Sequence, residues 1–88
     1  MERFRSMQAT YGYEGGKAVF YSCRSKVLAI DGDTIELCRD YDYSRTTGKQ
    51  IRYYFYDIWG IDLGVPELRK ALKNGTEVYG RKVVMGDF

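Results

Sequence analysis

The sequence contains no histidine and only two cysteines, which removes most side-chain catalysis and metal binding. Without His, the chain lacks the commonest general base and metal ligand, and it cannot form a Ser-His or Cys-His nucleophile pair. Cys23 and Cys38 do not have Cys-x-x-Cys spacing, so they cannot hold a structural zinc ion. No Gly-rich motif that would bind phosphate is present. We therefore predict a protein that is not an enzyme and that uses no cofactor and no metal.

Long apolar runs are also missing. No stretch approaches the roughly 20 apolar residues that a membrane helix needs. The segment 1–5 is charged, so it does not have the pattern of a signal peptide. We therefore predict a cytoplasmic protein with no membrane contact, in which both thiols are reduced.

The sequence has no large excess of either charge, since it contains 14 basic and 12 acidic residues. Neither charge is gathered in a tail, so binding to nucleic acid would need a local patch created by folding. Tyrosine, in contrast, is abundant: the chain has nine Tyr, four Phe and one Trp. Tyr combines a large apolar ring with a polar tip, and it suits both small cores and binding surfaces.

The 88 residues fit one domain preceded by an arm. Residues 1–16 mix charge, Tyr and Gly without a clear period, so we predict an N-terminal arm that is either flexible or adds one extended segment. Residues 17–88 are predicted to form a single α+β domain. Its strand candidates are the β-branched and aromatic runs 18–21, 26–30 and 34–39, and a last strand at 81–85.

An Asp-Gly pair at 31–32 predicts a β-hairpin between the second and third runs. With a loop of two or four residues, one face of the hairpin carries Leu28, Ile30, Ile35 and Leu37. A three-residue loop would instead pair Val27 and Ala29 with the residues of the next strand. The even loop buries more carbon, so we expect it, with Cys38 on the opposite face and partly exposed or covered by another element.

Apolar periodicity predicts two helices. One face of the first, over about 47–59, has i, i+3, i+4, i+7, i+8 spacing and carries Ile51, Tyr54, Phe55, Ile58 and Trp59. Thr47 and Gln50 form a candidate capping box, and Gly60 ends the helix. The second runs over about 66–74, with Pro66 at its first position and Gly75 after its end. The predicted fold class is α+β: a small antiparallel sheet of three to four strands with both helices packed on one face.

Asp31 and Asp33 are the best candidates for a catalytic carboxylate pair. A metal nuclease would also want a Glu-x-Lys on a neighbouring strand, and the sequence has none. A calcium loop starting at Asp31 would need Glu at its twelfth position, where Asp42 stands. We therefore interpret both aspartates as turn residues.

The outward face of the first helix carries basic and tyrosine side chains. Opposite the apolar arc lie Lys49, Arg52, Tyr53 and Tyr56, and an earlier helix start would add Arg45. Arg and Lys can neutralise phosphates while Tyr stacks on bases. The same residue types suit an acidic protein surface, since Tyr and Arg dominate interface hot spots. We predict these five residues as the candidate binding site; the simpler interpretation is a solvated helix face.

Two segments carry a resemblance: Ser22-Cys23-Arg24-Ser25-Lys26-Val27-Leu28-Ala29, and Tyr43-Ser44-Arg45-Thr46-Thr47-Gly48-Lys49-Gln50-Ile51. Together they resemble a family of small uncharacterised proteins of gut bacteria, their phages and mobile elements. In that family a Ser-Tyr-x-Thr segment enters a strand and a Tyr-Ser-x-Thr-Thr-x-Lys-His segment opens a helix. Here Cys23 stands in place of the usual Tyr, and Gln50 in place of the usual His. The resemblance implies a strand–hairpin–helix core over residues 19–60 and the cytoplasm of a phage's host, but no activity.

Several functions stay open at this point. The first is nucleic-acid binding through the basic and tyrosine face. The second is binding of a protein or nucleoprotein complex, for example as an inhibitor of a host defence or processing complex. A small hydrolase using the hairpin aspartates is a third class. The run 81–85 could also pair two copies of the chain across a two-fold axis, which would give a homodimer.

Overall fold

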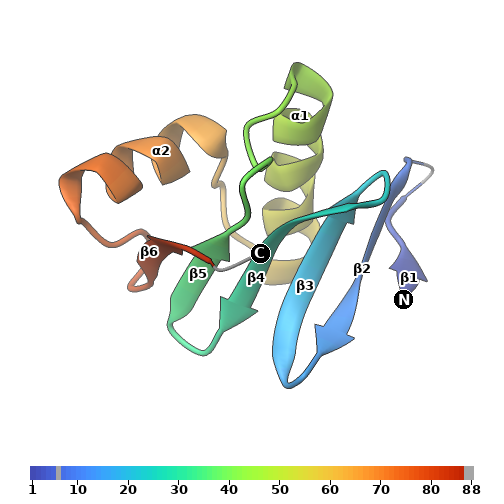
Figure 1. Ribbon diagram of the computed structural model, residues 1–88, viewed down its shortest axis with the longest axis horizontal. Helices are drawn as coiled ribbons and strands as arrows, with labels where there is room; N and C mark the ends of the chain where they lie inside the picture. Colours follow the sequence, from blue (N-terminus) through green and yellow to red (C-terminus); the bar gives the residue numbers. More distant parts are fainter. Residues whose placement is uncertain (6, 87–88) are drawn as a thin grey trace.

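The computed structural model describes residues 1–5 and 7–86, which form one sheet with helices on one of its faces (Figure 1). The elements in chain order are β1 (Glu2–Arg3), β2 (Ala9–Glu14), β3 (Lys17–Ser22), β4 (Ser25–Asp31), β5 (Thr34–Leu37), α1 (Arg45–Tyr54), the π-helix η1 (Phe55–Trp59), α2 (Val65–Asn74) and β6 (Lys82–Met85). The strands lie in the order β1-β2-β3-β4-β5-β6. The predicted α+β class is confirmed, but the sheet is larger than the three to four strands expected.

The additional strands come from the segment 1–16. β2 pairs antiparallel with β3 from Ala9↔Ser22 to Glu14↔Lys17, and the short β1 pairs with β2. Two buried side chains, Phe4 and Ala9, attach this segment to the core. Phe4 meets Phe20 edge-to-face with 5.4 Å between ring centroids, which is a favourable aromatic geometry.

The predicted antiparallel sheet is wrong at one edge, because β6 runs parallel to β5. The register runs from Thr34↔Lys82 to Leu37↔Met85. Parallel neighbours need a long crossover connection, and the segment 38–81, which contains both helices, supplies it. The direction of the last strand therefore follows from how the helices are connected, which the local sequence of 81–85 does not encode.

The predicted hairpin register is confirmed. Asp31 pairs with Thr34 and Ile30 with Ile35, so the loop has two residues, Gly32 and Asp33, one position later than the expected Asp-Gly pair. Gly32 has a φ of 60°, a left-handed conformation that glycine adopts without strain. The even loop places four buried aliphatic side chains on the helix side of the sheet.

The first helix begins earlier than predicted and changes its winding near the end. Its N-cap is Ser44 rather than Thr47, because the Ser44 hydroxyl accepts a hydrogen bond of 3.1 Å from the Thr47 amide. The expected capping box is therefore wrong. Gln50 is buried instead, where its Oε1 accepts a hydrogen bond of 2.6 Å from the Ser22 hydroxyl. The predicted end at Gly60 is confirmed, with a φ of 67°.

The π-helix moves one residue out of the predicted apolar face. A π-helix bonds i to i+5, so each residue turns through a smaller angle than in an α-helix. Ile58 consequently lies away from the core and is 42% exposed, whereas Phe55, at the start of η1, is fully buried. The second helix starts one residue before the predicted position, so Pro66 is its second residue, and Gly75 ends it.

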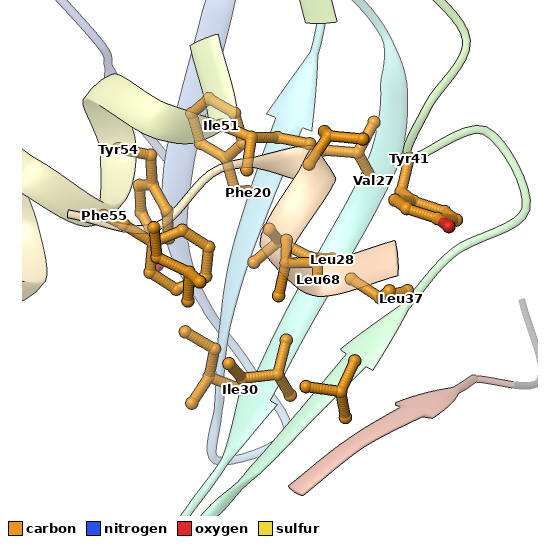
Figure 2. Close-up of a cluster of buried hydrophobic side chains, with 14 of the residues drawn as sticks. Phe20, Val27, Leu28, Ile30, Leu37, Tyr41, Ile51, Tyr54, Phe55 and Leu68 are labelled. Carbon is orange, nitrogen blue, oxygen red and sulfur yellow. The ribbon is translucent and has the colours of Figure 1, made fainter. Parts of the chain in front are cut away.

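One apolar cluster joins both helices to the sheet (Figure 2). Tyr54 of α1 stacks on Phe20 of β3 with 4.5 Å between ring centroids. Leu68 of α2 points toward Leu28 of β4 in the same cluster, and both side chains are fully buried. This packing fixes the inner face of α1, and thereby decides which of its side chains face outward.

Candidate functional site

The five predicted site residues lie on the outward side of α1 and η1. Arg45, Lys49, Arg52 and Tyr56 are exposed, while Tyr53 is half-buried. Arg45 belongs to this group because the helix begins at residue 45. Exposure alone does not distinguish a binding site from a solvated face, so the contacts of these residues matter more.

Two cations lie near the ring of Tyr53. The Arg5 guanidinium lies 4.2 Å from the centroid of the Tyr53 ring, and the Lys49 ammonium lies 6.0 Å from it. Both distances are within the range of a cation–π interaction. Arg5 comes from the turn after β1, far from the helix in sequence, so helical periodicity could not have identified it.

Arg5 is fixed in this position by Asp57 of η1. Its Nε and Nη2 donate to the two carboxylate oxygens at 2.6 and 2.8 Å, a bidentate geometry. This hydrogen bonding lowers the pKa of Asp57 and raises the pKa of Arg5. The pair ties the turn after β1 to the helix face and keeps the guanidinium against Tyr53.

A shallow cleft of about 340 Å³ brings three of the predicted residues together. Its lining is Arg5, Arg52, Tyr53, Tyr56 and Asp62. Nε and Nη2 of Arg52 both contact Oδ1 of Asp62, at 3.0 and 2.9 Å. Asp62 is therefore a second residue that sequence analysis missed; it lies in the segment between η1 and α2.

The positive charge of the face is concentrated at the start of α1. Arg5 and Arg52 are paired with aspartates, whereas Arg45 and Lys49 form no ion pair within the described part of the chain. The N-terminal end of a helix is itself positive, so a basic residue in the first turn costs about 0.3–1 kcal/mol of helix stability. Arg45 occupies that turn and no acidic residue does, so Arg45 does not stabilise the helix through its dipole.

Two further basic residues lie near this end of the molecule. Lys49 lines a groove with Cys23 and Met7, and Arg3 and Arg24 line a neighbouring groove that also includes Cys23 and Met7. Among residues 1–5 and 7–86, Arg3 and Arg24 form no ion pair. The two-residue turn between β3 and β4 places Arg24 here, and no periodic pattern in the sequence predicts that position.

The opposite face of the sheet carries charges that are mutually paired. Glu14 accepts from the Tyr21 hydroxyl at 2.6 Å and contacts the Lys26 ammonium at 2.8 Å, and Lys17 pairs with Glu36 at 3.1 Å. Hydrogen bonds from Lys26 and Tyr21 lower the pKa of Glu14. This face therefore presents neutralised networks, unlike the start of α1.

The remaining sequence candidates do not assemble into a reactive site. Asp31 and Asp33 lie exposed at the β4–β5 turn, and no group of three His, Cys, Asp or Glu residues gathers as a metal site in the described part of the chain. Cys38 is buried, and burial raises the pKa of its thiol to about 12. The sequence predicted that Cys38 is either partly exposed or covered by another element. Its burial excludes the first possibility and agrees with the second.

Comparison with protein-family models, with curated proteins and with solved structures finds no match to this chain. In the part of the chain that the structure describes, every helix is too short or too polar to cross a lipid bilayer.

Proposed function

We propose that this chain is a nucleic-acid-binding domain that uses the outward face of α1 and η1. The observation that carries the proposal is that Arg45 and Lys49, which have no acidic partner within the described residues, share the outward side of α1 and η1 with the half-buried Tyr53 and the exposed Tyr56. Tyr56 is 66% exposed, and the Arg5 and Lys49 cations lie 4.2 and 6.0 Å from the centroid of the Tyr53 ring. Cations beside aromatic rings are the recurring elements of surfaces that bind single strands.

A single strand fits this surface better than a rigid duplex. Two grooves include residues of this helix: the cleft near Asp62, lined by Arg52, Tyr53 and Tyr56, and the groove lined by Thr46, Lys49 and Cys23. A flexible strand can follow such grooves and place its bases on Tyr rings, whereas paired bases in a duplex are not free to stack. Arg3 and Arg24, which form no ion pair with other described residues, extend the positive surface beyond the helix.

The test is binding of labelled single- and double-stranded oligonucleotides, measured by fluorescence anisotropy at about 50 and 200 mM salt. If a single strand contacts about four basic residues, the affinity should fall by about 50-fold between these salt concentrations, since the logarithmic slope is roughly −0.7 per phosphate contact. Lys49→Glu should weaken binding and reduce the slope. Lys70→Glu makes the same charge change on the exposed side of α2 and should have little effect. Absence of binding at low salt would refute the proposal.

Binding of a protein partner is the second candidate function. The part of the face where arginines are paired with aspartates favours it. Arg52 and Arg5 are already neutralised by Asp62 and Asp57, so the region around Tyr56 has little net charge and resembles a protein interface rich in Tyr and Arg. The partner could be, for example, a complex that this chain inhibits. Tyr56→Ala should then weaken binding of the partner more than Lys49→Glu does. Its affinity would depend little on salt.

A further inference from the structure

The cleft between η1 and the segment leading to α2 has the walls of a base-binding pocket. Two of its lining residues, Tyr53 and Tyr56, are aromatic, and its volume of about 340 Å³ accommodates one planar base. Tyr53 is fixed by Arg5, and Arg52 is fixed by Asp62. Ligand sites typically combine such apolar walls with a few oriented polar groups.

The polar groups of the cleft combine one carboxylate with one guanidinium. The contacts from Arg52 both go to Oδ1 of Asp62, so among the described residues the second carboxylate oxygen, Oδ2, has no ion-pair or hydrogen-bond partner. The main chain at Asp62 is anchored, because the Tyr79 hydroxyl donates to its carbonyl oxygen at 3.2 Å. The cleft therefore offers a positioned acceptor beside a positioned donor, and both side chains are more than half exposed.

The hydrogen-bonding pattern selects one base. A carboxylate is acceptor-only when ionised, so Oδ2 of Asp62 favours a base edge whose adjacent groups are both donors over one that places an acceptor beside a donor. Guanine presents N1–H and the N2 amino group side by side, whereas adenine and cytosine each present one donor next to an acceptor, and uracil one donor between two carbonyls. Arg is also the preferred donor to the O6 and N7 acceptors of guanine.

A cationic group from a protein partner fits the cleft less well. The carboxylate of Asp62 already has Arg52 against it, and Arg5 lies at the same cleft while Lys49 lies on the neighbouring Tyr53 ring. A further cation would have to compete with Arg52 for Asp62, and Lys49, which has no acidic partner among the described residues, would repel it. A nucleotide carries a neutral base and a negative phosphate, which complements a pocket with cations at its edge.

We propose that the cleft of Arg5, Arg52, Tyr53, Tyr56 and Asp62 binds an unpaired guanine, stacked on the exposed Tyr56 ring and read by Asp62 and Arg52. This inference rests on the proposed function and gives it a base preference. Lys49 and Arg45 would then hold the phosphates of the flanking nucleotides.

The experiment compares oligonucleotides of about eight uridines with the same strand carrying one central guanosine, at about 50 mM salt. The guanosine should increase the affinity by about tenfold, at the lower end of the range expected for one specific base contact. Inosine, which lacks the N2 amino group, should lose most of this gain. A central adenosine should give no gain beyond stacking.

Asp62→Asn supplies the decisive variant, with Asp31→Asn as its matched control at the exposed β4–β5 turn. Both variants remove one negative charge, so both should bind the all-uridine strand slightly more tightly. Only Asp62→Asn should abolish the ratio of guanosine to uridine affinity. Thermal unfolding of both variants should match the unsubstituted protein, because both carboxylates are exposed.

The outcomes separate the two proposals. Equal affinity for both strands, or a guanosine preference that survives in Asp62→Asn, would overturn the guanine pocket and leave nucleic-acid binding in place. Absence of binding to either strand would overturn the proposed function and the pocket together. Binding of an arginine-rich peptide in place of both strands would do the same, and would assign the cleft to a protein partner.

Discussion

The two cysteines occupy different environments although each follows a strand. Cys23 is exposed at a two-residue turn with a φ of 58°, whereas Cys38 is 2% exposed and its amide donates to the Val27 carbonyl. A buried thiol reacts slowly because the reactive species is the thiolate. We expect a thiol reagent to modify one cysteine per chain in the folded protein and two in denaturant. Rapid modification of both under native conditions would contradict the structure.

The buried Cys38 thiol should also make stability depend on pH. Its pKa is raised to about 12 by burial, against about 8.5 for an unfolded thiol. The group therefore contributes fully to stability below pH of about 8.5, and the contribution is lost as the pH rises toward 12. Urea unfolding should show a falling free energy between about pH 8 and 10.5. Cys38→Ala should reduce that slope, while Cys23→Ala should leave it unchanged.

The hydrogen bond between Ser22 and Gln50 is a buried polar contact between the sheet and α1. Both residues are buried, and their oxygens are 2.6 Å apart. Ser22→Ala removes the donor, so we expect a loss of about 1–3 kcal/mol in the free energy of unfolding. Ser25→Ala, at an exposed position one turn away, should change it by less than about 0.5 kcal/mol. Chemical denaturation of the two variants checks this difference.

The start of α1 is the element whose boundary can be tested most directly. Ser44 caps the helix and Thr46 is exposed within its first turn. Ser44→Ala should destabilise the protein by about 1 kcal/mol through loss of the cap. Thr46→Ala should be neutral or slightly stabilising, because Ala has the higher helix propensity. Equal effects of the two substitutions would argue against Ser44 as the N-cap.

Periodicity predicted the elements whose side chains divide cleanly between core and solvent. The hairpin of β4 and β5 and the apolar face of α1 were found because Leu28, Ile30 and Ile51 recur at strand or helix spacing. β2 was missed because its Tyr, Thr and Gly residues are mostly half-buried, so alternation is weak. The π-helix was missed because the periodicity analysis assumes a constant 100° per residue, and η1 departs from that winding.

At the scale of the whole molecule, sequence analysis predicted only those site residues that belong to a single helical segment. Helical spacing grouped Arg45, Lys49 and Arg52, since these share a face of α1. Arg5 and Asp62 could not be assigned from sequence, because folding alone brings the turn after β1 and the segment before α2 against that face. The charge of the surface depends on these partners, so a count of basic residues along one helix overestimates it.

The two edges of the sheet should differ in their importance for stability. β6 buries Val83 beside Ile35, whereas both residues of β1 are exposed. Deletion of residues 82–88 should unfold the chain or cause aggregation, since it uncovers the core and leaves β5 as a hydrophobic edge. Deletion of residues 1–3 should lower the thermal midpoint much less. Circular dichroism melts of both truncated chains test this, and equal losses would contradict the unequal burial.

The parallel pairing of β5 with β6 also bears on the order in which the chain folds. β2 to β5 are joined by two-residue turns, so their pairings close quickly between neighbours in sequence. The β5–β6 pairing closes a loop that contains both α1 and α2. Because closing such a large loop costs more entropy, we expect this pairing to form late. Weakening β6, for example by Val83→Ala, should therefore accelerate unfolding while leaving the refolding rate nearly constant. The unfolding rate, and with it the lifetime of the folded chain, would then depend on how firmly β6 is held.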